Sequence, residues 1–113
     1  MARDLSFWKE KDNSEVKASD VYKALLNGEK LDFIYELPTE KILSDVKSTF
    51  SDWTQIDAYN YEKNGAAIEI YVNSQICRFD CYSVTEADMN KIIDIMLNYE
   101  CLLYDSAIDV RFC

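Results

Sequence analysis

The stretch 59–82 constrains the fold more than any other part of the sequence. Within it, Asn64-Gly65 separates two runs rich in β-branched and aromatic residues. This dipeptide favours a two-residue type I′ turn, because both central positions of that turn need a positive φ. The turn would place Tyr61 opposite Ile68 on neighbouring strands. The sequence therefore predicts a β-hairpin centred on residues 64 and 65.

A second turn at Asn73-Ser74 would add a third antiparallel strand to this hairpin. It would pair Ile70 with Cys77 and place Glu69 opposite Arg78, an opposite-charge cross-strand pair. The two turns agree on one apolar face, whereas a slip of one residue would mix apolar and charged side chains on both faces. The predicted apolar face consists of Tyr59, Tyr61, Ile68, Ile70, Val72, Cys77, Phe79 and Cys81.

Three further segments show the capping residues and apolar spacing of helices. Ser19 can cap a first helix that Asn27-Gly28 ends, and Pro38 suits the first turn of a second helix over about 38–51. Ser83 with Glu86 fits a capping box for a third helix. The apolar stripe of that third helix is predicted to be Met89, Ile92, Ile93, Met96 and Leu97.

Short apolar segments near both ends of the chain complete the predicted sheet. Residues 5–8 and 101–104 are expected to be strands, and residues 110–112 either extend the sheet or pack as a tail. A length of 113 residues suits one domain. We therefore expect a single α+β domain over residues 1–113, with an antiparallel-rich sheet, a central three-stranded meander and about three helices packed mainly on one face. The opposite face stays open unless the N-terminal helix covers it.

The composition argues against most kinds of catalysis. The chain has no histidine, which excludes Ser-His-Asp and Cys-His pairs and His-ligated zinc. Both glycines are assigned to turns, so no phosphate-binding loop remains. Cys77 and Cys81 lack the Cys-x-x-Cys spacing of zinc or redox motifs and are expected to be buried thiols. We therefore predict no catalytic residue, cofactor or metal, although a hydrolase built on a carboxylate pair stays open.

The charge balance limits the kind of partner. With 21 acidic and 12 basic residues the net charge is −9, which opposes nucleic-acid binding. Residues 1–56 carry 11 acids and 8 bases (−3), and residues 57–113 carry 10 acids and 4 bases (−6). This asymmetry either serves solubility or attracts a cationic partner.

The sequence also predicts where the protein works. The N-terminus lacks the apolar region and cleavage site of a secretory signal, and no apolar run approaches the roughly 18 residues that span a bilayer. We expect a cytoplasmic protein with reduced cysteines and no membrane association.

Several stretches of the chain resemble a known group of proteins. They are DLSFW (4–8), RFDCY (78–82), DMNKIIDI (88–95), LYD (103–105) and RF (111–112). With these stretches, the chain resembles small bacterial immunity-type proteins that accompany polymorphic or contact-dependent growth inhibition toxins. The resemblance implies a non-catalytic cytoplasmic protein that binds and neutralises a cognate toxin domain, such as a nuclease. From the charge we expect that domain to be cationic, and we expect this protein to be a monomer or a weak dimer. It does not identify the residues that contact the toxin.

Two surfaces are candidates for the toxin contact. The first is the open sheet face, with Glu69, Tyr71, Asp80 and Tyr82. The second is the C-terminal loop, with Asp105 and Asp109. An alternative function is a small-molecule-binding or regulatory domain, which a closed apolar pocket near Trp8, Trp53 and Tyr104 would favour.

Overall fold

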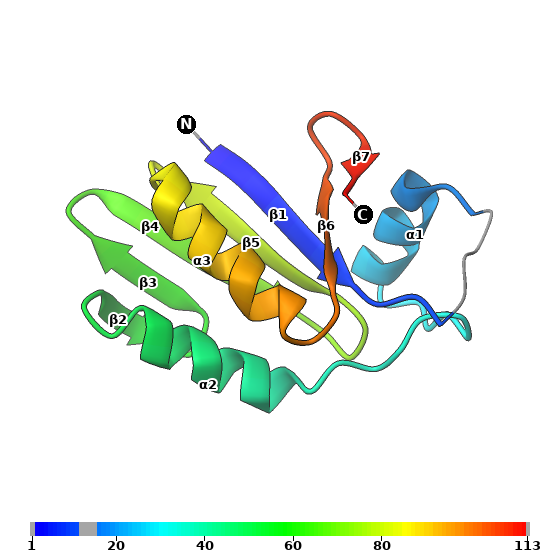
Figure 1. Cartoon of the computed structure of the whole chain (residues 1–113), viewed down its shortest axis with the longest axis horizontal. Coiled ribbons are helices and arrows are strands. Elements are labelled where there is room, and N and C mark those ends of the chain that lie inside the picture. Colours follow the sequence, from blue (N-terminus) through cyan, green and yellow to red (C-terminus); the bar gives the residue numbers. More distant parts are fainter. Residues whose placement is uncertain (1, 12–15, 113) are drawn as a thin grey trace.

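The computed structural model describes residues 2–11 and 16–112, and it has the predicted α+β architecture (Figure 1). Cys113 lies outside the described residues. The elements in chain order are β1 (Ala2–Trp8), α1 (Ala18–Leu26), α2 (Thr39–Thr49), β2 (Thr54–Asp57), β3 (Asn60–Lys63), β4 (Ala66–Val72), β5 (Cys77–Tyr82), α3 (Glu86–Leu97), β6 (Leu102–Asp105) and β7 (Val110–Arg111).

The strands form one antiparallel sheet of seven strands in the order β2-β3-β4-β5-β1-β6-β7. The predicted meander is the run β3-β4-β5, and the predicted C-terminal strands are β6 and β7. β1 inserts between β5 and β6, so a strand from the start of the chain connects the meander with strands from its end (Figure 1).

The hairpin at Asn64-Gly65 is confirmed. Both residues have a positive φ, 49° and 85°, as a type I′ turn requires. Tyr61 pairs with Ile68, which is the predicted register. Tyr59, however, lies before β3 and is 46% exposed, so the prediction that it faces the core was wrong. Its backbone N–H instead donates to Asp57, in a turn between β2 and β3.

The predicted register of the second hairpin was wrong by two residues. The loop has four residues, from Asn73 to Ile76, and Val72 pairs with Cys77. The Asn73 side-chain oxygen accepts hydrogen bonds from the backbone N–H groups of Gln75 and Ile76, which stabilises the longer loop. A shift of two residues returns every side chain to the same face.

This shift changes the cross-strand partners on both faces of the meander. Ile70 pairs with Phe79 instead of Cys77. Glu69 lies opposite Asp80, and not opposite Arg78 as predicted. The expected opposite-charge pair is therefore replaced by two carboxylates that face each other.

Helices α2 and α3 cover one face of the sheet and enclose the main core (Figure 1). The core includes the edge-to-face pair Phe7 and Phe79, whose ring centroids are 5.9 Å apart. Its other buried side chains come from both helices and from β1, β3, β4, β5 and β6, and include Ile42, Val46, Tyr61, Ile68, Ile92 and Met96.

The helices lie mainly on one face, as expected, because α2 and α3 share it, whereas α1 packs on the opposite face. Beneath α1 is a smaller core of Trp8, Val21, Leu25, Ile34, Ile76 and Tyr104. This core covers the end of the sheet where β1 meets β6, and the end of α1 also reaches Tyr71 of β4, whose hydroxyl donates to the backbone oxygen of Leu26. It leaves β3 and the far ends of β4, β5 and β1 without a helix on this face.

The caps of two helices differ from the prediction. Thr85, and not Ser83, caps α3, and its hydroxyl accepts from the backbone N–H of Asp88 at 3.2 Å. Ser83 has a φ of 55° and belongs to the turn before the helix. Ser19 lies inside α1, whose N-cap is Lys17. The spacing of Thr85 and Asp88 satisfies the capping rule as well as that of Ser83 and Glu86, so the sequence alone cannot choose.

Candidate protein-binding surface

The four residues predicted on the open sheet face do lie together there. Glu69 and Tyr71 belong to β4, and Asp80 and Tyr82 belong to β5, all on the side opposite α2 and α3. Glu69 and Tyr82 are exposed, whereas Tyr71 and Asp80 are half-buried. The reason is local, because alternate residues of a strand point to opposite faces. The residues next to these four in the chain, Ile68, Ile70, Phe79 and Cys81, point into the core.

Three carboxylates form a line across neighbouring strands of this face, and we call Asp4, Asp80 and Glu69 the acidic row. Asp4 of β1 is the direct partner of Asp80 on β5, and Asp80 is the direct partner of Glu69 on β4. Like charges directly opposite each other in a sheet are destabilising. The register that buries the apolar face therefore brings these carboxylates together at a cost to stability.

Arg78 supplies the positive charge next to the acidic row. Its Nε lies 3.0 Å from Oδ1 of Asp80. The centre of its guanidinium group is 5.5 Å from the Tyr71 ring centroid, and the Tyr22 side chain of α1 is a further hydrogen-bond partner. Arg78 is thus held by protein groups on several sides, and one cation faces the three carboxylates of the row.

The crowding of charge shows in the protonation equilibria of the row. Burial, followed by the hydrogen bond with Asp4, raises the pKa of Asp80 to about 6, although Arg78 acts in the opposite direction. The negative charge of Glu69, followed by burial and the charge of Asp80, raises the pKa of Tyr82. Like charges contribute to both shifts in addition to burial: that of Asp4 for Asp80, and those of Glu69 and Asp80 for Tyr82.

The two tyrosines of this face differ in their freedom. The Tyr71 hydroxyl donates to the backbone oxygen of Leu26 at the end of α1, at 3.4 Å, and its ring lies beside Arg78. Tyr82 is 39% exposed and lies in line with Ala2 and Ala67 on the neighbouring strands. Tyr82 is therefore the aromatic side chain that a partner would reach first.

The C-terminal carboxylates are not brought to the acidic row. Asp105 is 3% exposed, pairs with Arg3 at 3.0 Å and accepts from the backbone N–H of Ala107. Its carboxylate is thus used inside the fold and is not accessible to a partner. Asp109 is exposed and accepts from the Tyr104 hydroxyl at 2.8 Å. It lies next to β7, at the edge of the sheet beyond β6.

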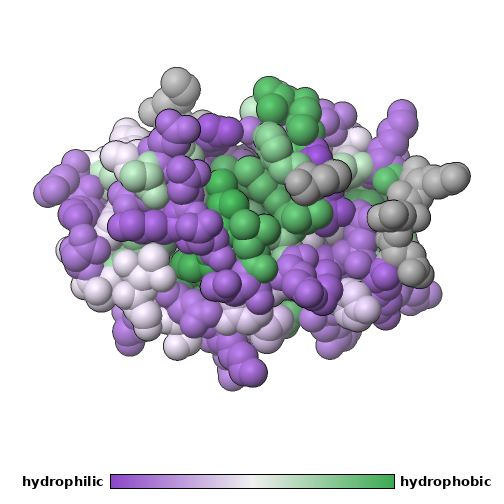
Figure 2. Space-filling view, viewed as in Figure 1, coloured by the Kyte–Doolittle hydropathy of each residue, from purple (hydrophilic) through white to green (hydrophobic). Residues whose placement is uncertain are grey.

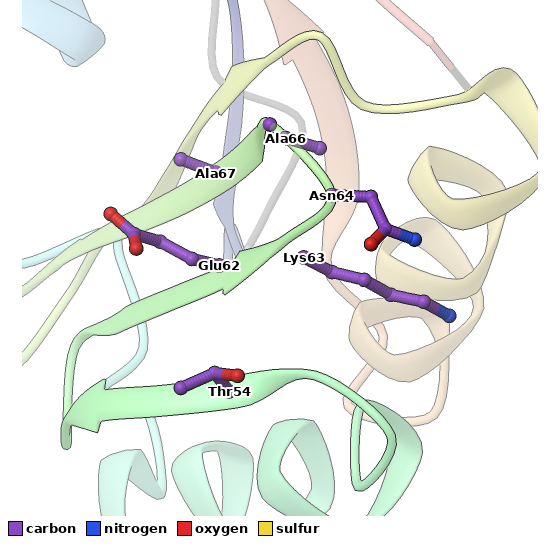
Figure 3. Close-up of a pocket in the computed structure, with 7 residues that line it drawn as sticks. Thr54, Glu62, Lys63, Asn64, Ala66 and Ala67 are labelled. Atoms are coloured by element: carbon purple, nitrogen blue, oxygen red, sulfur yellow. The ribbon is translucent and has the colours of Figure 1, made fainter.

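A shallow hollow of about 350 Å³ surrounds the tip of the β3–β4 hairpin (Figure 3). Glu62 and Lys63 point away from each other in this view, and Lys63 pairs with Asp52 on the loop before β2. The remaining lining residues are small or polar: Thr54, Asn64, Gly65, Ala66 and Ala67. Ligand pockets are usually concave and lined by apolar and aromatic side chains, so this hollow does not fit a small-molecule site.

The pocket expected by the small-molecule alternative is not assembled. Trp8 and Tyr104 contact each other beneath α1, with ring centroids 5.3 Å apart, and both are buried. Trp53 packs against Phe50 in the main core on the other side of the sheet. The sheet thus separates Trp53 from the other two side chains, and they line no common cavity.

The described cysteines are buried thiols. Burial raises the pKa of Cys77 well above its ordinary range, that of Cys81 to about 12 and that of Cys101 to about 11. Such thiols stay protonated and are poor nucleophiles. Within residues 2–11 and 16–112, no three cysteine or carboxylate side chains are grouped closely enough to hold a metal ion.

Apolar side chains gather on the other face of the molecule, over the space between α3 and β6 and at the turn between β6 and β7 (Figure 2). Leu97 of α3 is 48% exposed, and Ile108, Val110 and Phe112 near β7 are exposed to similar degrees. Val110 and Phe112 flank Arg111, which pairs with Tyr104 of β6. We call these four residues the apolar patch; the sheet separates it from the acidic row.

Sequence reasoning missed Asp4 as a member of this surface. Residues 4–8 alternate between polar and apolar side chains, which is the signal that assigns Asp4 to the face opposite Leu5. Its position beside Asp80, however, depends on the pairing of β1 with β5, two strands from opposite parts of the chain. No local pattern predicts that pairing.

Among the described residues, none of the helices combines the length and the apolarity needed to cross a bilayer. No family model, curated protein or solved structure matches this chain.

Proposed function

We propose that this protein is a non-catalytic immunity protein that binds a cognate bacterial toxin domain in the cytoplasm and neutralises it. The contact surface is the acidic row together with Tyr82. The observation that carries the proposal is the line of three carboxylates on the sheet face opposite α2 and α3. The resemblance of five stretches of the chain to immunity-type proteins supports the same function.

The electrostatics of the surface suit a cationic partner. Enzymes that cleave nucleic acids bind a polyanion and therefore need basic substrate clefts. A protein with a net charge of −9 and a concentrated acidic face is attracted to such a cleft. Opposite charges raise association rates above the roughly 10⁵–10⁶ M⁻¹s⁻¹ of neutral pairs. Rapid capture requires no chemistry from the inhibitor.

The surface also has the composition of a protein interface. Aromatic side chains often form the energetic centre of an interface, and charged groups form its rim. Tyr82 provides an exposed ring within reach of the acidic row, and Glu69 and Asp80 lie beside it. We therefore place Tyr82 at the centre of the contact and Glu69 at its rim, in a protein that is monomeric or weakly dimeric.

The first experiment co-expresses the protein with the product of the adjacent upstream reading frame. We expect the two chains to purify as a complex whose affinity falls as the salt concentration rises. If the product is not a toxin domain, or if it purifies without this protein, the proposed function is wrong.

A pair of charge reversals then locates the contact. Glu69→Lys changes an exposed member of the acidic row, and Glu40→Lys makes the same charge change on α2, on the opposite face. We expect Glu69→Lys to lower the association rate about tenfold or more and Glu40→Lys to lower it by less than about threefold. Equal effects would indicate only a general charge contribution. If Leu97→Asp in the apolar patch disrupts the complex and Glu69→Lys does not, the contact lies on the other face.

A further inference from the structure

The turn residues Asn64 and Gly65 combine a reactive sequence with an open position at the tip of the β3–β4 hairpin (Figure 3). The backbone nitrogen that follows an asparagine can attack the side-chain amide carbon, and glycine hinders this attack least because it has no Cβ. We propose that Asn64 is a site of spontaneous covalent modification, at which the side chain deamidates through a succinimide ring that includes the Gly65 nitrogen. This modification does not depend on the proposed function.

The reaction consumes one water molecule and releases one molecule of ammonia. The Gly65 nitrogen gives its proton to solvent and forms a bond to Cγ of Asn64. The bond between Cγ and Nδ2 breaks, and Nδ2 takes a proton from solvent and leaves as ammonia. Water then opens the ring at one of its two carbonyl carbons. Opening at Cγ leaves aspartate, whereas opening at the main-chain carbon leaves isoaspartate, in which the main chain runs through the former side chain.

The reacting groups at this tip are open to solvent and are not held by other groups. Asn64 and Gly65 are both exposed, and a Cβ on Gly65 would meet no atom within 4 Å. Within residues 2–11 and 16–112, neither the Asn64 side-chain amide nor the Gly65 N–H has a hydrogen-bond partner. Exposed segments with few contacts open locally at little cost, so the ring can form without unfolding of the sheet.

The chain contains a second Asn-Gly sequence, Asn27-Gly28, which is also exposed but has a different backbone. Asn27 continues the helical conformation of α1, with φ −77° and ψ 0°. The Gly28 N–H donates to the backbone oxygen of Leu25 at 3.1 Å. The next N–H, that of Glu29, donates to the oxygen of Ala24. Attack by the Gly28 nitrogen requires its hydrogen bond to break, so we expect α1 to protect this asparagine.

The two products of the reaction affect the hairpin differently. Aspartate before glycine also suits a type I′ turn, so this product keeps the hairpin and adds one negative charge to the net charge of −9. Isoaspartate adds a methylene group to the main chain of a turn in which only Asn64 and Gly65 connect β3 and β4. The longer turn disfavours the pairing of Lys63 with Ala66 directly beside it. Isoaspartate therefore weakens the hairpin.

The test incubates the full unmodified chain at pH 7.5 and 37 °C and follows both Asn-Gly sequences by digestion and mass spectrometry. In the folded protein, we expect deamidation at Asn64 to be at least about tenfold faster than at Asn27, because only the second site is held by backbone hydrogen bonds. In concentrated urea, which removes both local structures, the two rates should agree within about threefold. The urea experiment is thus the matched control for the effect of the fold.

The products at position 64 test the ring itself. A succinimide gives both isoaspartate and aspartate, whereas direct hydrolysis of the amide gives aspartate alone. Asn64→Asp provides the aspartate product in pure form and should unfold at the same urea concentration as the unmodified protein, while the separated isoaspartate form should unfold at a lower one. Aspartate as the sole product would overturn the proposal. So would a rate at Asn64 in the folded protein that is no higher than the rate at Asn27.

Discussion

The two faces of strands β4, β5 and β1 are built from alternate residues of the same segments, yet they differ in almost every property. On one face Leu5, Ile68 and Phe79 are at most 1% exposed beneath α2 and α3. On the other face the neighbouring residues Asp4, Glu69 and Asp80 form a row of like charges. The comparison shows that one register determines both faces: the alignment that packs the core also assembles the acidic row.

The faces also differ in how they affect stability. Burial of apolar side chains is the main favourable contribution to folding, at roughly 25 cal/mol per Å² of apolar surface. The acidic row opposes folding, because Asp80 must be partly desolvated next to Asp4 and opposite Glu69. The buried face therefore supports a neighbouring surface that is unfavourable by itself, which is typical of a functional site.

The largest contrast should come from Phe79→Ala on the buried face. Phe79 is fully buried and contacts the Phe7 ring, so the substitution leaves a cavity in the main core. We expect a loss of about 3–5 kcal/mol in the free energy of unfolding, measured with urea. The control Ile56→Ala removes a side chain that is 56% exposed and should cost less than about 1 kcal/mol. Similar losses for both would contradict the assignment of the core.

On the other face, Asp80→Asn should raise the free energy of unfolding instead of lowering it. The size of this gain should depend on pH. The pKa of Asp80 is about 6 in the folded protein against an ordinary value of 3.8. The favourable contribution of the protonated group is therefore complete below about pH 4 and lost as the pH rises through about 6. The difference between the two values corresponds to at most about 3 kcal/mol.

Urea unfolding of both proteins at pH 4 and pH 7.5 measures this effect. Relative to the unmodified protein, Asp80→Asn should gain about 1–3 kcal/mol of stability when the pH is raised from 4 to 7.5. The comparison between proteins cancels the contributions of other carboxyl groups that keep their environment. A difference that is the same at both pH values would show that the row does not destabilise the fold.

Gly65→Ala should weaken the hairpin on which the register of both faces depends. Gly65 has a φ of 85°, and a Cβ there would meet no atom within 4 Å, so the strain comes from the backbone alone. We expect a loss of about 1–2 kcal/mol in the free energy of unfolding. Gly28→Ala, at a φ of 82° after α1 and equally without contacts, is the matched control outside the sheet. If Gly28→Ala lowers the free energy of unfolding more than Gly65→Ala does, the hairpin makes no special contribution to stability.

Glu69→Gln should produce the smallest change. It removes an exposed carboxylate opposite Asp80 and keeps the shape of the side chain. We expect a gain of about 0.2–0.5 kcal/mol in the free energy of unfolding at low salt, and less at 1 M salt, because surface charge interactions are screened. Thermal unfolding at the two salt concentrations checks this. A loss of stability would mean that Glu69 has a favourable partner instead of a repulsive one.

The sequence predicted the candidate surface better than it predicted the pairing within it. Glu69, Tyr71, Asp80 and Tyr82 were assigned to the correct face although the second hairpin was placed two residues out of register. The error had no effect on the faces, because side chains alternate with a period of two. It did affect the partners, and so the predicted pair of Glu69 with Arg78 was wrong.

The local patterns of the chain determined which residues form strands and helices and which side of each strand is apolar. They could do so because alternation, helical spacing and the Asn64-Gly65 turn are properties of adjacent residues. Only the tertiary structure decided that β1 lies between β5 and β6, that α1 covers part of the opposite face, and that Asp4 meets Asp80. These contacts join distant segments, and their geometry follows from how the whole core packs rather than from any local signal.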